Sequence, residues 1–450
     1  MGSSVKLEDV ANKIPADDMH FHRQTIADLL GRNQITFPGA QPVSFARKHF
    51  QELQNTDYYL CEKTDGIRCL LYLTSFVDAD GDIEAQFLID RKNDYWYIPR
   101  DSLHLPVQGH IGEFHRATIL DGELVRQTDS QGNSRLMYLI FDCLCLDGNS
   151  ITSRTLDIRL GKVRAFVYEP WQEFKKRYPQ DVDAQPFQLE FKKMELPYGI
   201  DMMFRQVLPN LPHGNDGLIF TCKTTPYIYG TDKNILKWKP PHENTIDFKL
   251  QIGAFPKLED GEGEYEDWDA KPHFDLLVNH GGNDGGYQKY AELELLDSEW
   301  EAMKLLNESF DHRIIECWKD PNIPQRGEWE VWRPKLEPNN TPRFRDDKKD
   351  ANHISTVNSV MDSIEDAVTE EELIRRQGEI RTAWKKRAEV GNQRELAKRK
   401  EAELAKRRQM EAAQRQQRQQ PPQQASQQQQ QQQQQQVDGG DSDGPTYDDE

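Results

Sequence analysis

The stretch Lys63-Thr64-Asp65-Gly66-Ile67-Arg68 separates two short apolar runs, Tyr58–Cys61 and Cys69–Thr74, whose residues favour β-strands. At average residue usage, a chain of this length contains about 0.1 Lys-x-Asp-Gly matches by chance. Taken alone, Lys63 is explained as well by a solvated lysine at a strand end as by a reactive group. Residues further along the chain decide between the two.

Five further blocks come after it in order, each combining charged residues with a short apolar run. Three carry an Asp-Gly pair or a Phe-Asp pair, and two carry paired cations. They are Asp121-Gly-Glu-Leu-Val125, Tyr138-Leu-Ile-Phe-Asp-Cys-Leu144, Asp216-Gly-Leu-Ile-Phe220, Leu236-Lys-Trp-Lys-Pro240 and Arg343-Phe-Arg-Asp-Asp-Lys348. Six blocks in this order exclude coincidence.

The residue types in these blocks suit attack of a lysine amine on phosphorus. Free lysine has a pKa near 10.4 and is mostly protonated at neutral pH. Neighbouring cations and a bound metal lower that pKa and activate the amine. Lys237 and Lys239 would supply such cations, and on a strand they would point to the same side and hold a phosphate. The blocks therefore predict a phosphoramidate on Lys63, with charge neutralisation around the phosphate.

The net charge of −19 argues against a generally basic RNA-coating protein, because phosphate repels acidic surfaces. The acidity is uneven, however, since residues 251–300 hold three basic and thirteen acidic residues. The chain lacks a run of eighteen apolar residues, and its six cysteines are sparse. We therefore expect a soluble intracellular protein with buried, reduced cysteines and no membrane contact.

The first unit, residues 1–240, combines helices with strands spaced as in antiparallel sheets. This mixed pattern predicts an α+β fold. The expected helices are Asp17–Leu30 and Ser44–Leu53, and Thr155–Tyr178 is expected to form one helix or two. The expected strands are Tyr58–Cys61, Cys69–Thr74, Ala85–Ile89, Tyr95–Ile98, Thr118–Leu120, Met137–Phe141 and Gly217–Thr221.

The second unit, residues 241–350, predicts a small β-barrel with one helix. Its expected strands are Thr245–Ile252, Phe274–Val278, Tyr287–Leu296, Ile314–Trp318 and Trp329–Arg333, and its helix is Ser298–Glu308. An acidic insert at 258–269 holds seven acids and no base, so we expect a solvated loop there.

The rest of the chain changes composition three times. Residues 351–375 predict a helix that packs back on the core, and residues 376–418 predict a basic, charged helix. Residues 419–450 contain ten consecutive glutamines and an acidic end, so we expect this Gln-rich tail to be disordered.

The six blocks resemble those of the covalent nucleotidyltransferase superfamily, which contains mRNA-capping guanylyltransferases and polynucleotide ligases. Within it, the chain is similar to the fungal mRNA-capping enzyme alpha subunits. Phe37-Pro-Gly-Ala-Gln-Pro-Val-Ser-Phe45, Phe-Asp-x-Leu at 141–144 and Arg343–Lys348 carry that likeness, which covers roughly residues 15–365. It implies a nucleotidyltransferase domain at 1–240 followed by an OB-fold domain at 241–350.

The resemblance also implies roles for eleven residues. Lys63 corresponds to the nucleophile that accepts GMP. Arg68, Arg91 and Glu123 correspond to ribose contacts, Phe141 to the aromatic residue that stacks on guanine, and Lys237 and Lys239 to the α-phosphate lysines. Asp216 corresponds to a carboxylate of the metal-dependent step, with Glu123 as a second metal residue. Arg345, Asp347 and Lys348 correspond to a C-terminal motif that closes over the β- and γ-phosphates.

Several simpler interpretations stay open. Phe141 lies in an apolar strand and could belong to the core. Asp121 could be an ordinary turn residue and receives no direct role, and Asp65 is treated as structural. Either Lys192 or Lys193 could donate to guanine O6. Pro334, Pro338 and Pro342 favour a loop before the last block.

The resemblance implies transfer of GMP from GTP, through Lys63, to the 5′-diphosphate end of nascent mRNA, with Mg²⁺ or Mn²⁺ as cofactor. It further implies a separate RNA 5′-triphosphatase subunit, contact with the phosphorylated C-terminal domain of RNA polymerase II, and a nuclear location. One alternative is an ATP-dependent polynucleotide ligase, which shares Lys-x-Asp-Gly. Another is a catalytically silent scaffold of the transcription machinery.

Overall fold

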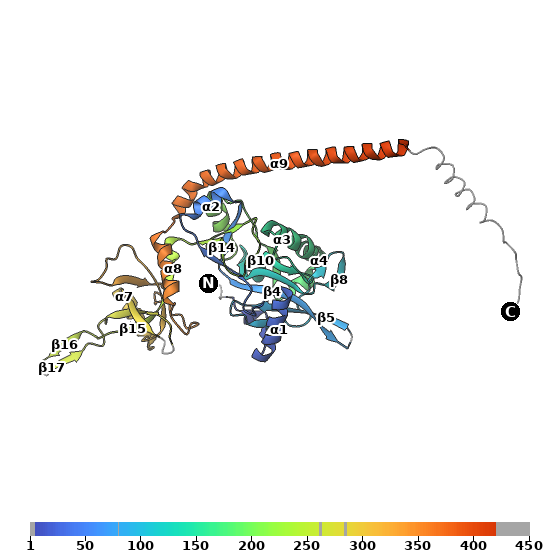
Figure 1. The fold of residues 1–450 in the computed structure, drawn as a ribbon. Coiled ribbons are helices and arrows are strands. Elements are labelled where there is room, and N and C mark those ends of the chain that lie inside the picture. The colour runs from blue at the N-terminus through green and yellow to red at the C-terminus, as the bar shows by residue number, and fades with distance from the viewer. Residues whose placement is uncertain (1–4, 80, 261–262, 283–285, 420–450) are drawn as a thin grey trace, which may run out of the picture. The chain divides into compact units, whose positions relative to one another are not determined.

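The computed structural model describes residues 5–79, 81–260, 263–282 and 286–419 (Figure 1). The chain divides into two units, residues 1–384 and 385–450, and each is described by itself. Among the described residues, no helix has the length and apolar character needed to cross a membrane. All of the predicted Gln-rich tail after Gln419 lies outside the described residues.

The larger sheet of the first unit has eight strands, and nearly all neighbouring strands run antiparallel. Seven strands have the order β1 (Asn12–Lys13), β6 (Tyr95–Tyr97), β5 (Gly81–Ile89), β4 (Ile67–Asp78), β9 (Thr118–Thr128), β10 (Ser134–Leu146) and β11 (Asn149–Ser150). The eighth, β12 (Gln188–Phe191), pairs with β10 in parallel.

Both faces of this sheet are covered. In β4, Leu71 and Leu73 face one hydrophobic cluster, whereas Leu70 and Tyr72 face another, because successive side chains point to opposite faces. The first cluster is closed by α3 (Leu156–Val163), the π-helical turn η2 (Arg164–Tyr168), α4 (Glu169–Arg177) and α5 (Pro179–Asp183). The second is closed by α1 (Ala16–Leu29).

A smaller sheet of four strands lies beside the larger one. Its order is β2 (Ala40–Ser44), β14 (Gly230–Trp238), β13 (Asn215–Cys222) and β3 (Tyr58–Thr64). Its core also contains residues from α2 (His49–Asn55), α6 (Ile200–Met202) and the adjoining turn η3 (Met203–Val207). The remaining short elements are η1 (Leu7–Asp9), β7 (Pro106–Val107), β8 (His110–Phe114), η4 (Leu208–Asn210) and η5 (Pro241–Glu243).

Five later strands form a closed barrel, in the order β15 (Thr245–Ile252), β18 (Phe274–Asn279), β19 (Tyr287–Leu293), β21 (Glu330–Pro334) and β20 (Ile314–Trp318). Its core includes residues from α7 (Asp297–Leu306) and α8 (Ile354–Glu365). A two-stranded ribbon, β16 (Lys257–Asp260) and β17 (Gly263–Glu266), extends from it. The first turns of α9 (Glu370–Gln419) pack Leu373 and Ile380 into the core of the smaller sheet.

The predicted α+β class, with antiparallel sheets followed by an OB-type barrel, is confirmed. Thr245–Ile252 and Ile314–Trp318 match β15 and β20 residue for residue, and all barrel strands lie between residues 245 and 334. The predicted domain boundaries stay predictions. All six cysteines are free and buried, as expected.

Two predicted elements, the helix at Ser44–Leu53 and the loop at 258–269, were wrong in part. The helix expected at Ser44–Leu53 begins only at His49, because the preceding Ala40–Ser44 pairs with β14 as a strand. The one or two helices expected over Thr155–Tyr178 are α3 and α4, joined by the π-helical turn η2. The acidic insert is exposed as expected, yet its described residues form the ribbon of β16 and β17 rather than a loop.

Candidate functional site

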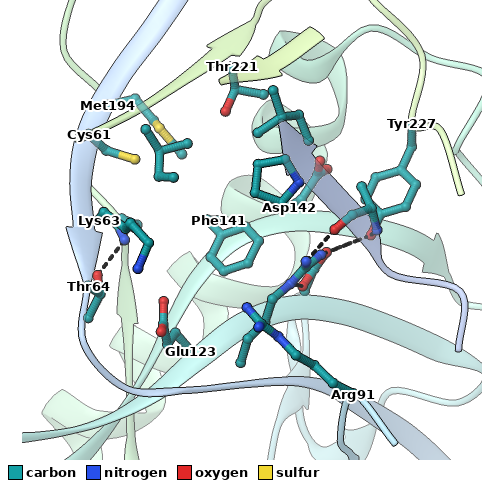
Figure 2. Close-up of a pocket in the computed structure, with 17 residues that line it drawn as sticks. Cys61, Lys63, Thr64, Arg91, Glu123, Phe141, Asp142, Met194, Thr221 and Tyr227 are labelled. Atoms are coloured by element: carbon teal, nitrogen blue, oxygen red, sulfur yellow. Dashed lines mark hydrogen bonds and ion pairs between the residues drawn. The ribbon is translucent and has the colours of Figure 1, made fainter. Parts of the chain in front are cut away.

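A pocket lies between the two sheets and is lined by residues from both (Figure 2). Five residues predicted from the sequence reach it, namely Lys63, Arg68, Arg91, Glu123 and Phe141. In Figure 2 the ring of Phe141 lies in the middle of the pocket, with Lys63 on one side and Tyr227 on the other. The smaller sheet contributes Lys63 from β3, and the larger sheet contributes Arg68, Glu123 and Phe141.

Lys63 ends in an ion pair at the mouth of this pocket. Its Nζ donates to Oδ1 of Asp216 at 2.5 Å, and Oδ2 of Asp216 pairs with Lys239 Nζ at 2.6 Å. Partial burial alone would raise the pKa of Asp216, but the charges and hydrogen bonds of the two lysines have the larger effect. The pKa of Asp216 is therefore lowered. One carboxylate thus joins the predicted nucleophile to a predicted phosphate lysine.

The position of Asp216 depends on the glycine beside it. The pairing of β13 with β3 is irregular between Asn215 and Leu218, so Asp216 and Gly217 form a local break in the ladder. Gly217 has a φ of +139°, and a Cβ there would lie 2.0 Å from the carbonyl oxygen of Trp238. Only glycine allows this approach of β13 to β14.

Lys237 forms no ion pair within the described part of the chain. Burial lowers its pKa, and the nearby charges of Lys239, Lys63 and Arg91 lower it further, against the smaller opposing effect of Asp216. Burial and the charge of Arg68 likewise lower the pKa of Arg91. Unbalanced cations packed together favour an anionic ligand. The predicted phosphate lysines therefore lie in the same electrostatic environment as Lys63.

Arg68 is held by Asp121 in a buried, bidentate ion pair. The Nε–Oδ1 distance is 3.0 Å and the Nη2–Oδ2 distance is 2.7 Å, while Tyr227 donates its hydroxyl to Asp121 at 2.6 Å. Desolvation opposes the charge of Arg68, but Asp121, Tyr227 and Glu123 together outweigh it and raise the pKa of Arg68. Asp121 is fully buried within β9, so its interpretation as a turn residue was wrong.

The ring of Phe141 is flanked by cations. The Arg68 guanidinium lies 5.5 Å from its centroid and the Lys192 ammonium 6.0 Å. Phe141 is half-buried and is absent from the hydrophobic clusters of the described residues. The irregular pairing of β10 between Ile140 and Asp142 turns it toward the pocket.

Lys192 and Lys193 have opposite surroundings. Lys192 is buried, lines the pocket, donates to the Thr64 hydroxyl and lies 3.4 Å from Glu62. The side chain of Lys193 is 78% exposed and pairs with Glu195. The structure thus brings only Lys192 of this pair to Phe141. The sequence alone could not separate two adjacent lysines without the strand pairing that orients them.

Glu123 reaches the pocket from β9, where its carboxylate is buried near three cations. Its Oε1 accepts the backbone N–H of Gly66 at 3.2 Å. Burial raises the pKa of Glu123, although the charges of Lys192, Lys63 and Arg91 oppose the rise. Its carboxylate and that of Asp216 are the acidic oxygen donors predicted for a metal, and Lys63 interacts with both.

Arg345, Asp347 and Lys348 lie in the barrel, on a segment after β21. Arg345 pairs with Asp347 at 3.0 Å and lies within 3.6 Å of Asp247 and Glu316, while Lys348 pairs with Asp247. Within the described residues, the ion pairs of these cations are all with barrel carboxylates. The structure does not place them among the residues that line the pocket.

Comparisons with known proteins agree with this geometry. The family models of the mRNA capping enzyme match residues 7–241 (catalytic domain) and 243–374 (C-terminal domain).

The chain belongs to the mRNA capping enzyme family.

Relatives named mRNA-capping enzyme subunit alpha match most of the length of this capping enzyme. The mRNA-capping enzyme subunit alpha of Neurospora crassa is 46% identical over 84% of this chain and 93% of that protein. The subunit of the same name from Schizosaccharomyces pombe is 42% identical over 82% of this chain and 87% of that protein. The one from Saccharomyces cerevisiae is 35% identical over 78% of this chain and 81% of that protein. The predicted family and the predicted capping function as a nucleotidyltransferase are confirmed.

A solved ligase structure is also similar. Mycobacterial DNA ligase D complexed with ATP and MES covers 69% of this chain and 95% of its own, at 14% identity and a TM-score of 0.29. This similarity is too low to favour the ligase alternative.

Proposed function

We propose that this capping enzyme works as an mRNA guanylyltransferase through a covalent Lys63–GMP intermediate. In the first step the neutral amine of Lys63 attacks the α-phosphorus of GTP. The P–N bond forms, the bond to the β-phosphate breaks, and pyrophosphate leaves together with one proton. In the second step a β-phosphate oxygen of the RNA 5′-diphosphate attacks the same phosphorus, the P–N bond breaks, and the lysine nitrogen takes up a proton.

One observation carries this proposal: Lys63 lies at the mouth of a pocket whose other residues suit a nucleoside. Phe141 offers an aromatic face for a purine, and Lys192 offers an ammonium beside that face. A carbonyl such as guanine O6 accepts from an ammonium, whereas the adenine amino group at the same position donates. Lys192 therefore favours GTP over ATP, and Arg68, Arg91 and Glu123 are left for the ribose.

Lys237 and Lys239 are proposed to hold the α-phosphate. Lys237 forms no ion pair in the described chain, and Lys239 shares Asp216 with Lys63. Because an ammonium bound to a carboxylate cannot attack phosphorus, Lys63 has to leave Asp216 before the first step. The negative charge of the bound α-phosphate would then replace that of Asp216 beside these lysines.

The carboxylates of Asp216 and Glu123 fit a hard divalent cation. Mg²⁺ and Mn²⁺ prefer oxygen ligands and are commonly held by one or two carboxylates together with substrate phosphates. A bound cation would neutralise phosphate charge and draw Asp216 away from Lys63. Both carboxylates interact with Lys63, which supports them as the metal residues.

The barrel is proposed to complete the site by closing over the triphosphate. Arg345 and Lys348 carry the cations that would reach the β- and γ-phosphates, with Asp347 orienting Arg345 through its bidentate pair. Opening would then admit RNA, which is a lid motion common in enzymes. Residues 1–240 would act as the nucleotidyltransferase domain and residues 241–350 as the lid.

The relatives' shared name, subunit alpha, supports a heteromeric capping complex for this chain. We propose a nuclear location, an RNA 5′-triphosphatase as its partner subunit, and the phosphorylated tail of RNA polymerase II as a further contact. The triphosphatase would supply the 5′-diphosphate that the second step consumes.

Nucleotide labelling tests the proposed activity. The full chain is incubated with a divalent cation and either α-labelled GTP or α-labelled ATP, and the protein is analysed for covalent label. A guanylyltransferase takes label from GTP. Label from ATP alone would favour a ligase, and label from neither nucleotide would favour a silent scaffold.

A further inference from the structure

A second, open groove lies next to the nucleotide pocket. Its lining includes Arg23 from α1, Phe37, Gly39 and Gln41 from the segment around β2, and Arg91 and Lys92 from the turn after β5. Arg91 lines both this groove and the nucleotide pocket. The two spaces therefore adjoin at a cation, and the proposed mechanism leaves the groove unused.

The groove is positively charged. Within the described residues, neither Arg91 nor Lys92 has an ion pair, and no carboxylate is among the residues that line the groove. Asp90 next to them is occupied by the backbone N–H groups of Lys92 and Asp94 and by the Trp96 indole. Two adjacent cations that form no ion pair are a favourable place for phosphates.

The same groove carries a fixed aromatic ring. Phe37 is half-buried and lies so close to Gly39 that a Cβ on the glycine would fall 2.1 Å from the ring. The adjoining backbone is also held, because the Asn93 side chain donates to the carbonyl of Ile35 at 2.7 Å. Such a ring can stack on a base of any identity, as is usual where single strands are bound without sequence preference.

On the basis of the proposed function, we propose that this groove binds the 5′-terminal nucleotides of the acceptor RNA during the second step. While GMP occupies the pocket, the acceptor needs its own path to the phosphorus on Lys63. A groove that shares Arg91 with the pocket supplies that path. Lys92 would bind the first phosphates, Arg91 would stay with the ribose of the bound GMP where the two spaces meet, and Phe37 would stack on a leading base.

The two half-reactions of the full chain test this proposal. Enzyme–GMP formation from GTP is measured first, and then transfer of GMP from the isolated intermediate to a short 5′-diphosphate RNA. Lys92→Glu reverses an exposed charge outside the nucleotide pocket, so enzyme–GMP formation should stay within about twofold. Transfer at low RNA concentration should fall about tenfold or more, and the salt dependence of RNA binding should weaken by about one phosphate contact.

Two further variants sharpen the test. Lys176→Glu makes the same charge change on α4, away from the groove, and should alter neither half-reaction. Phe37→Ala should weaken RNA binding through lost stacking, by about 5- to 150-fold, without changing its salt dependence. Wild-type transfer and wild-type RNA binding in both Lys92→Glu and Phe37→Ala would overturn the proposal, as would equal losses in Lys92→Glu and Lys176→Glu. Absence of enzyme–GMP in the unmodified protein would instead overturn the proposed function itself.

Discussion

At the residue scale, Asp121 determines where Arg68 lies. It has no exposed surface, yet it receives two hydrogen bonds from the guanidinium and one from Tyr227. These contacts hold Arg68 beside Phe141, where the sequence had suggested only a ribose contact. A buried carboxylate behind a predicted site residue is thus part of the site.

Replacing Asp121 tests this role. Asp121→Ala leaves a buried guanidinium without its partner, which typically costs about 3–5 kcal/mol of unfolding free energy. Unfolding by urea, monitored by circular dichroism, measures the loss. Asp121→Asn keeps the size and some hydrogen bonds, so it should lose less. An alanine variant as stable as the unmodified protein would contradict the importance of the pair.

The sequence predicted this site in part. Lys63, Arg68, Arg91, Glu123 and Phe141 all line one pocket. Four of them were found because they belong to the recognisable blocks, and Arg91 was found through the family resemblance. Three other contributors, Asp121, Lys192 and Tyr227, were missed or left open. Their roles depend on which strands are neighbours and on burial, and neither property is visible in a local run of residues.

At the element scale, the approach of β13 to β14 brings Asp216 next to Lys239. Gly217→Ala would place a methyl group against the carbonyl oxygen of Trp238 in a left-handed backbone conformation. We expect a loss of at least about 2 kcal/mol in stability and reduced enzyme–GMP formation, because the strain must move Asp216. Thermal unfolding and labelling with GTP measure the two effects.

Gly132→Ala is the matched control. Gly132 also has a positive φ, +85°, but nothing lies within 4 Å of its missing Cβ. It should cost about 1 kcal/mol and leave labelling unchanged. Equal effects of the two substitutions would show that backbone conformation alone matters and that the contact between the strands does not.

Strands with continuous apolar runs were predicted well, as Cys69–Thr74 within β4 illustrates. Both faces of β4 are buried, so its residues are apolar without alternation. By contrast, Ala40–Ser44 forms a strand only through parallel pairing with β14, almost two hundred residues later. The local sequence, with a proline at its centre, gives no sign of that pairing.

At the scale of the whole molecule, the net charge of −19 is separate from the charge of the pocket. Thirteen acids lie in residues 251–300, and the described part of the acidic insert is an exposed ribbon of the barrel. The pocket and its mouth gather Lys63, Arg68, Arg91, Lys192, Lys237 and Lys239. An acidic chain can therefore contain a cleft that attracts phosphates.

The proposed closure of the barrel predicts unequal effects on the two steps. Arg345→Ala removes a cation meant for the β- and γ-phosphates, which are present only in the first step. Enzyme–GMP formation should therefore fall by about tenfold or more, whereas transfer from preformed enzyme–GMP to RNA should change less. Rapid-quench measurements separate the two. Greater damage to transfer than to formation would contradict the closure.

The most direct test of the central claim is to locate the covalent nucleotide. The full chain and its Lys63→Ala variant are incubated with GTP and a divalent cation, digested, and examined by mass spectrometry. We expect GMP on the peptide that contains Lys63, joined through nitrogen, and no modified peptide in the variant. GMP on another residue, or undiminished modification of the Lys63→Ala protein, would contradict the assignment of Lys63 as the nucleophile.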